Sequence, residues 1–204
     1  MHSVKLVILG RDGILNTYRE DHVKGPEEWE PIPGALDAVA RLNQAGWHVV
    51  VATNQAGIGR GMIDMAAVNA VHAEMHRRLQ ARGARIDAIF FCPHAPEDQC
   101  DCRKPAPGLM RDIAWRYGVQ LHDVPMVGDT LRDLQAAQAA GCPPHLVRCG
   151  RAQALGPAEL ADIQAQVPGA RVHDSLDAFV DHLLAQEDLP RSGPAPLGAH
   201  AGRR

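Results

Sequence analysis

The sequence of 204 residues lacks several features that mark whole classes of protein. No apolar run approaches the length of a membrane-spanning helix, and we expect no membrane partner. The net charge is −3 and the only basic run is the terminal Arg203-Arg204, which argues against nucleic acid as a main partner. The first apolar run, residues 6–9, is too short and too soon followed by charge for a signal peptide. We therefore expect a cytoplasmic protein, and the length favours one domain.

Cysteine is also scarce, with five residues in all. Cys92, Cys100 and Cys102 cluster around His94 with the spacing C-x-H-x5-C-x-C. These four ligands suit a closed tetrahedral site, so the spacing predicts a structural zinc ion in loop 92–102. The alternative is a coincidental cluster in which Cys100 and Cys102 have a redox role.

Apolar stretches alternate with helical patterns along the chain, which is typical of an α/β fold. We expect a doubly wound parallel sheet in a single domain, 1–186, followed by a disordered tail, 187–204. Connections after the first and third strands are too short for a separate cap domain. The predicted strands are 4–9, 47–52, 86–91, 125–127, 144–147 and an edge strand at 171–173. The predicted helices are 34–45, 66–82, 107–117, 131–140, 159–166 and 176–186.

Three of the predicted strands end in polar groups that suit phosphate or a metal ion. Residues 4–9 lead into Gly10-Arg11-Asp12-Gly13, residues 49–52 into Thr53-Asn54-Gln55, and residues 125–127 into Gly128-Asp129-Thr130. Ligands bind at the carboxyl ends of strands in open α/β sheets. Alternatively, Asp12 only bonds its own turn, and Asp129 and Asp133 only favour the start of a helix.

The stretch from Cys102 to Gly108 adds the cations Arg103 and Lys104. The combination of two aspartates, a threonine and a lysine is typical of a magnesium-assisted phosphoryl-transfer site. Mg²⁺ takes oxygen ligands and binds only a few carboxylates. Threonine and lysine side chains can hold phosphate oxygens.

The ordered motifs GRDG…N, TNQ, CRKP and GDTLRD resemble those of the haloacid dehalogenase-type phosphatases. The C-x-H…C-x-C-R-K-P loop is closest to the heptose bisphosphate phosphatases and the related histidinol phosphatases. The resemblance covers residues 4–149. It implies a hydrolase that removes the 7-phosphate of D-glycero-D-manno-heptose 1,7-bisphosphate, a small sugar phosphate used to make cell-surface lipopolysaccharide. We expect the chain to be a monomer.

The resemblance also implies a role for each matching residue. Asp12 acts as general acid and base, Thr53 and Lys104 hold the phosphoryl oxygens, and Asp12 and Asp129 bind Mg²⁺. Asp133 orients Lys104 or the metal's water. The residues expected to line the substrate pocket are Tyr18, Arg19, Glu20, Asp21, Asn54, Gln55 and Arg103, with Arg103 on a second phosphate.

One position departs from the family pattern. The family turn is D-x-D-G, its first aspartate is the nucleophile and a magnesium ligand, and here that position is Gly10. Glycine has no carboxylate to attack phosphorus, so we expect this chain to turn over very slowly. The alternatives are a histidinol-phosphate phosphatase, for which Glu20 and Asp21 could meet an amine, and a sugar-phosphate-binding protein without catalysis.

Two further motifs have simpler interpretations. The stretch 55–62, QAGIGRGM, predicts a glycine-rich turn that lets the backbone pass close to the site. His72 and His76 share one helical face, and we expect surface or packing roles for them rather than metal binding.

Overall fold

The computed structural model describes residues 4–187. Its sheet has six parallel strands in the order β3-β2-β1-β4-β5-β6. The strands are β1 (Leu6–Leu9), β2 (His48–Asn54), β3 (Ala88–Cys92), β4 (Met126–Gly128), β5 (Pro144–Val147) and β6 (Arg171–His173). The helices are α1 (Ala35–Gln44), α2 (Ala56–Gly59), α3 (Met65–Gln80), α4 (Gly108–Tyr117), α5 (Leu131–Ala140), α6 (Pro157–Gln166) and α7 (Leu176–Glu187).

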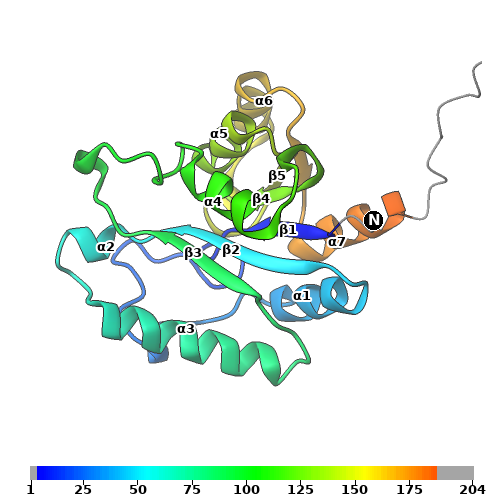
Figure 1. Cartoon of the computed structure of the whole chain (residues 1–204). Helices are drawn as coiled ribbons and strands as arrows, with labels where there is room; N and C mark the ends of the chain where they lie inside the picture. The colour runs from blue at the N-terminus through cyan, green and yellow to red at the C-terminus, as the bar shows by residue number, and fades with distance from the viewer. Residues whose placement is uncertain (1–3, 188–204) are drawn as a thin grey trace, which may run out of the picture.

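Helices cover both faces of the sheet (Figure 1). On one face, Val7 and Leu9 of β1 join a core with α1, α3 and α7. On the other face, Leu6 and Ile8 pack with α4 and α5. Every residue of β1 is fully buried, because a central parallel strand has helices on both sides. The predicted doubly wound fold is confirmed.

The strand order places two carboxyl ends side by side at the centre of the sheet. Strand β1 pairs with β2 on one side and with β4 on the other, so the order reverses between β1 and β4. Such a switch point opens a crevice between the loops that leave the two strands. These loops carry Asp12 and Asp129, and their end of the sheet lies on the side of α2 in Figure 1.

The predicted elements are all present, with ends displaced by one or two residues. The prediction of a plain glycine-rich turn at 55–62 was wrong, because Ala56–Gly59 forms the short helix α2. Its turn packs tightly: a Cβ on Gly59 would lie 2.8 Å from the carbonyl oxygen of Pro93. Helix α7 extends to Glu187, and the rest of the predicted tail lies outside the described residues.

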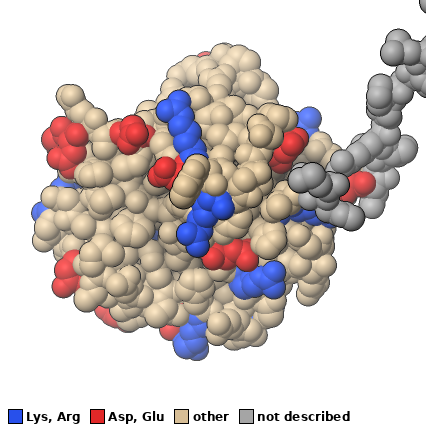
Figure 2. All heavy atoms as spheres, in the orientation of Figure 1, with Lys and Arg blue, Asp and Glu red and all other residues tan. Residues whose placement is uncertain are grey.

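The connections after β1 and after β3 contain no separate cap domain within the described residues, as predicted. Between β1 and α1 the described chain forms a short 3-10 helix, Pro26–Glu28, and two isolated β-bridges. Between β3 and α4 it forms another short 3-10 helix, Pro96–Asp98. Within residues 4–187, no helix is long and apolar enough to span a membrane. Basic and acidic side chains are interspersed on the face shown in Figure 2.

Candidate active site

A cavity of about 290 Å³ opens where the loops after β1, β2 and β4 meet. Most of the residues predicted from the motifs line it. They are Gly10, Asp12, Tyr18, Arg19, Glu20, Thr53, Asn54, Arg103, Lys104, Asp129 and Asp133. Two predicted pocket residues, Asp21 and Gln55, are not in this lining. The fold thus brings together side chains from positions 10 to 133 of the chain.

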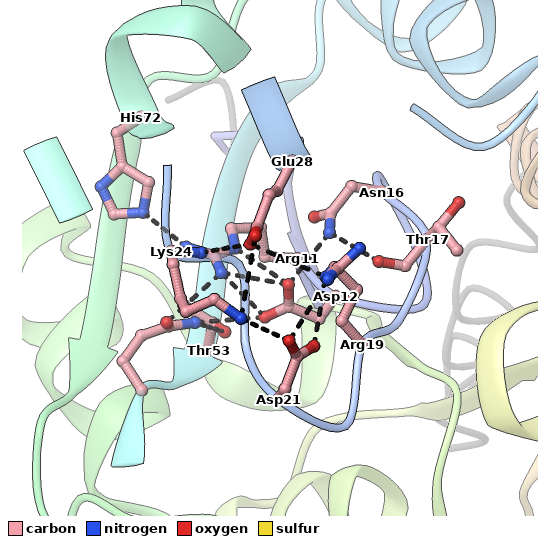
Figure 3. Close-up of polar contacts among 11 residues, drawn as sticks. Arg11, Asp12, Asn16, Thr17, Arg19, Asp21, Lys24, Glu28, Thr53 and His72 are labelled. Atoms are coloured by element: carbon pink, nitrogen blue, oxygen red, sulfur yellow. Dashed lines mark hydrogen bonds and ion pairs between the residues drawn. The ribbon is translucent and has the colours of Figure 1, made fainter. Parts of the chain in front are cut away.

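Asp12 lines the cavity and is held by a partly buried hydrogen-bond network (Figure 3). Arg11 Nη2 donates to both of its carboxylate oxygens, at 3.0 and 3.1 Å. Asn16 Nδ2 and Gln55 Nε2 donate to them at 3.0 and 3.1 Å. Burial alone would raise the pKa of Asp12, but Arg11, Asn16 and Gln55 outweigh it and lower that pKa. Asp12 is therefore fixed in place as a carboxylate.

Arg11 is itself buried, with 2% of its surface exposed, and it bridges Asp12 to α3. Its Nη1 lies 3.1 Å from His72 Nε2. Burial first, and then Arg11 and His76, lower the pKa of His72 to about 4, so His72 is neutral near pH 7 and its Nε2 accepts. The expected packing role of His72 is confirmed, and it includes a specific hydrogen bond below the site.

Gln55 lies beneath the cavity and connects two functional side chains. Its Nε2 donates to Asp12 Oδ2 at 3.1 Å and to Thr53 Oγ1 at 3.0 Å. The side chain is 2% exposed. We predicted that Gln55 lines the substrate pocket, and the structure instead makes it a residue that orients Asp12 and Thr53.

Lys104 and Asp133 form a buried ion pair that lines the cavity. Lys104 Nζ lies 2.7 Å from Asp133 Oδ1, both side chains are 7% exposed, and Nζ also donates to the carbonyl oxygen of Ala52 at 2.8 Å. Asn54 exchanges hydrogen bonds with the backbone of Lys104, both at 3.1 Å. Asp133 thus orients Lys104, as one of the sequence interpretations expects.

Asp133 also lies in the first turn of α5, so the helix-entry interpretation holds as well. Its Oδ2 accepts from Thr130 Oγ1 at 2.7 Å and from the Thr130 amide at 3.1 Å. Burial opposes its ionisation, but Lys104 and Thr130 hold the pKa of Asp133 below its usual range. The Asp133 carboxylate therefore both caps the start of α5 and orients Lys104.

Asp129 is 2% exposed and bonds to a residue that no motif indicates. Arg151 approaches it with Nε on Oδ2 and Nη2 on Oδ1, each at 3.2 Å. Burial and the neighbouring Asp133 raise the pKa of Asp129, although Arg151 works in the opposite direction. Gly13, at φ +82°, lets the turn after β1 pass this carboxylate, because a Cβ there would lie 2.2 Å from Asp129 Oδ2.

Gly10 lies at the end of β1, where its amide donates to the carbonyl oxygen of Val127 at 2.9 Å. A Cβ at this position would meet Ile14 Cγ1 at 3.1 Å and the Val127 oxygen at 3.7 Å. Its backbone is not in the left-handed region that favours glycine. A side chain at position 10 therefore needs only a shift of a few tenths of an ångström by Ile14.

The loop expected to bind substrate is tied together by ion pairs at the cavity mouth (Figure 3). Lys24 pairs with Asp21, and Arg19 Nε lies 3.3 Å from Asp21 Oδ1 and 3.7 Å from Glu28 Oε2. Asp21 thus stabilises the loop rather than facing the cavity. Among the described partners of Tyr18 is the Arg151 guanidinium, 4.3 Å from the ring centroid.

The predicted zinc ligands lie together in the loop after β3. The ligand atoms of Cys92, His94, Cys100 and Cys102 all lie within 4.8 Å of one another. The Cys100 sulfur lies 3.5 Å from the other two cysteine sulfurs, and His94 Nδ1 lies 3.2 Å from Cys102 Sγ. Sulfurs at the corners of a zinc tetrahedron are about 3.8 Å apart, so this donor set fits the ion. Arg103 follows directly and donates to the His94 carbonyl oxygen at 3.3 Å.

Sequence reasoning assigned no role to several cavity residues, among them Arg11, Arg132 and Arg151. Arg11 and Arg132 lie inside quoted motifs and could have been found there. Arg151 follows β5 with no motif around it, and only the fold brings it to Asp129.

The geometry agrees with what comparisons with known proteins find. The family model described as HAD-hydrolase-like matches residues 101–179. The chain is 53% identical over 184 residues to a D-glycero-β-D-manno-heptose-1,7-bisphosphate 7-phosphatase of Bordetella bronchiseptica, covering 90% of this chain and 99% of the relative. It is 48% identical over 183 residues to the enzyme of the same name from Pseudomonas aeruginosa, covering 89% of this chain and 99% of that one.

A solved structure also matches. The D,D-heptose 1,7-bisphosphate phosphatase of B. bronchiseptica, complexed with magnesium and phosphate, superposes with a TM-score of 0.83 at 52% identity. The match covers 90% of this chain and 99% of that one. The chain belongs to the D-glycero-β-D-manno-heptose-1,7-bisphosphate 7-phosphatase family of haloacid dehalogenase-like phosphatases.

Proposed function

We propose that the cavity binds D-glycero-β-D-manno-heptose 1,7-bisphosphate with its 7-phosphate at the switch point, and that Gly10 limits the hydrolysis of that phosphate. The observation that carries the proposal is the convergence of Asp12, Thr53, Lys104 and Asp129 on one cavity, in a chain whose relatives carry this enzyme name. The relatives do not favour the histidinol-phosphate alternative.

Lys104 and Thr53 supply the positive and polar groups for the phosphoryl oxygens. The ion pair with Asp133 and the bond to Ala52 fix the lysine, and Gln55 fixes the threonine. Preorganised groups of this kind stabilise the charge that phosphoryl transfer spreads over the equatorial oxygens. Asp12, held by Arg11, can take a proton from water in its ionised form, and it can give a proton to the leaving alcohol when it is protonated.

The missing group is the carboxylate at position 10. Removing the nucleophile of a catalytic unit lowers the rate by about a millionfold in a serine protease, and we expect a loss of that order here. Because position 10 accepts a Cβ, the Gly10→Asp side chain can enter the cavity without rebuilding β1. The same substitution restores a carboxylate ligand for Mg²⁺.

The remaining residues fit Mg²⁺ in part. Magnesium needs one or two carboxylates and keeps several waters, and Asp129 provides one carboxylate at the correct strand end. Bound there with the Asp12 main chain, the ion would neutralise charge on the phosphate. We also propose that zinc occupies the Cys92, His94, Cys100 and Cys102 cluster, where it stiffens the loop that carries Arg103.

Two broader expectations remain proposals. Reduced, clustered cysteines suit the cytoplasm, so we place the protein there. We also propose that the chain acts as a monomer.

The direct test is phosphate release from heptose 1,7-bisphosphate with Mg²⁺, for this chain beside Gly10→Asp. We expect activity only in the Asp form. A third protein, Gly10→Asp with Asp12→Asn, keeps the nucleophile and removes the acid and base, so its steady-state rate should fall sharply. Equal activity in the first two proteins would refute the assigned nucleophile. Tight substrate binding with no turnover in either would support the binding-protein alternative.

A further inference from the structure

Arg151 holds the carboxylate that the proposed metal site depends on. Its Nε and Nη2 each lie 3.2 Å from one oxygen of Asp129, so the guanidinium spans both oxygens. The Arg151 amide adds a third bond to Oδ2 at 2.9 Å. Paired donors from one guanidinium are among the strongest partners of a carboxylate.

The other side of the same guanidinium faces an aromatic ring. The Arg151 Cζ lies 4.3 Å from the ring centroid of Tyr18, well inside the range of a cation–π contact. The Arg151 side chain is 34% exposed. Arg151 is therefore held between Asp129 and the substrate loop, although it follows β5 and Tyr18 follows β1.

The aspartates of the cavity are balanced by cations of the chain itself. Asp12 pairs with Arg11, Asp133 with Lys104, and Asp129 with Arg151. Because Gly10 supplies no carboxylate, Asp129 is the one predicted side-chain ligand for Mg²⁺ that remains, and its carboxylate is already bonded to Arg151. The guanidinium spans both oxygens of Asp129. A metal ion cannot use a lone pair of these oxygens while the guanidinium is bonded to it.

We propose that Arg151 competes with Mg²⁺ for Asp129 and lowers the affinity of this chain for the ion, with Tyr18 holding the guanidinium in its competing position. The inference rests on the proposed function only in taking this cavity as the magnesium site. The proposed role of Arg151 concerns the affinity for Mg²⁺. This role is separate from phosphate binding and from hydrolysis.

Isothermal titration with Mg²⁺, in the absence of any phosphate compound, tests the competition. Arg151→Met should raise the affinity at least tenfold over the unmodified chain. Arg132→Met is the matched control, because Arg132 lines the same cavity and carries the same charge, yet makes no described bond to Asp129. Tyr18→Leu, which keeps Arg151 and removes its ring support, should raise the affinity by a smaller factor.

Two outcomes would overturn the inference. One is an equal rise in Arg151→Met and Arg132→Met, which would mean that only net charge matters. The other is an unchanged or weaker affinity in both Arg151→Met and Tyr18→Leu, with thermal unfolding showing that they are folded. Gly10→Asp separates the two proposals: if it binds Mg²⁺ while Arg151→Met shows no gain, only the competition fails, and if no variant binds Mg²⁺, the magnesium site fails as well.

Discussion

Breaking the buried ion pair between Lys104 and Asp133 should destabilise the fold as well as the site. Lys104→Met keeps the length of the side chain and removes its charge. Asp133 then remains 5% exposed, with a carboxylate that has lost its cation but still accepts from Thr130. Breaking a buried pair by removing one partner costs about 3–5 kcal/mol, and the remaining hydrogen bonds place the cost near the lower end, about 3 kcal/mol.

Urea unfolding at pH 7 measures this cost. With a slope of about 2 kcal/mol/M, the midpoint should fall by about 1.5 M and the slope should stay unchanged. Arg82→Met is the control, because Arg82 and Asp37 also approach within 2.9 Å but are both 58% exposed. An exposed pair contributes less than about 1 kcal/mol. Equal, small losses in both variants would refute the argument that Lys104 and Asp133 form a buried pair.

Three further predictions follow from other clusters. His72→Ala leaves Arg11 Nη1 buried without its acceptor, so the free energy of unfolding, measured in urea, should fall by about 1–3 kcal/mol; an unchanged value would contradict the bond. Burial, with charges from His173, His182 and Arg171, lowers the pKa of His145 to about 3, so below pH 6.5 the unfolded chain binds a proton that the folded chain does not. Stability should therefore fall as the pH drops, by about 2 kcal/mol from this group between pH 6.5 and 5, and urea unfolding of His145→Leu should show a shallower fall; parallel curves would contradict this. Finally, chelation of zinc should lower the melting temperature, whereas Cys100→Ser protein should melt low with or without chelator; a chelator effect of equal size in both would argue against the four-ligand cluster.

The sequence predicts the strand ends well because each combines an apolar run with a polar turn. Asp12 and Asp129 follow β1 and β4, and the parallel order brings them to one crevice. The cluster of Cys92, His94, Cys100 and Cys102 is equally predictable, since these residues are close in the chain.

Contacts between distant segments are what the sequence does not predict. Arg151 reaches Asp129 and Tyr18 only because β5 lies beside β4, and no local pattern distinguishes it from a surface arginine. Likewise, His72 meets Arg11 across 61 positions of the chain. Helix α2 was missed because its glycines disfavour a helix, and tertiary contacts override that preference.

We propose that a carboxylate at position 10 is the one part of a 7-phosphatase that this chain lacks. Phosphorus NMR of heptose 1,7-bisphosphate with Mg²⁺ resolves the 1-phosphate and the 7-phosphate separately. Gly10→Asp should convert the 7-phosphate signal to free phosphate and leave the 1-phosphate intact, while the unmodified chain leaves both signals unchanged. Rapid loss of the 7-phosphate with the unmodified chain, or loss of the 1-phosphate with Gly10→Asp, would contradict the account.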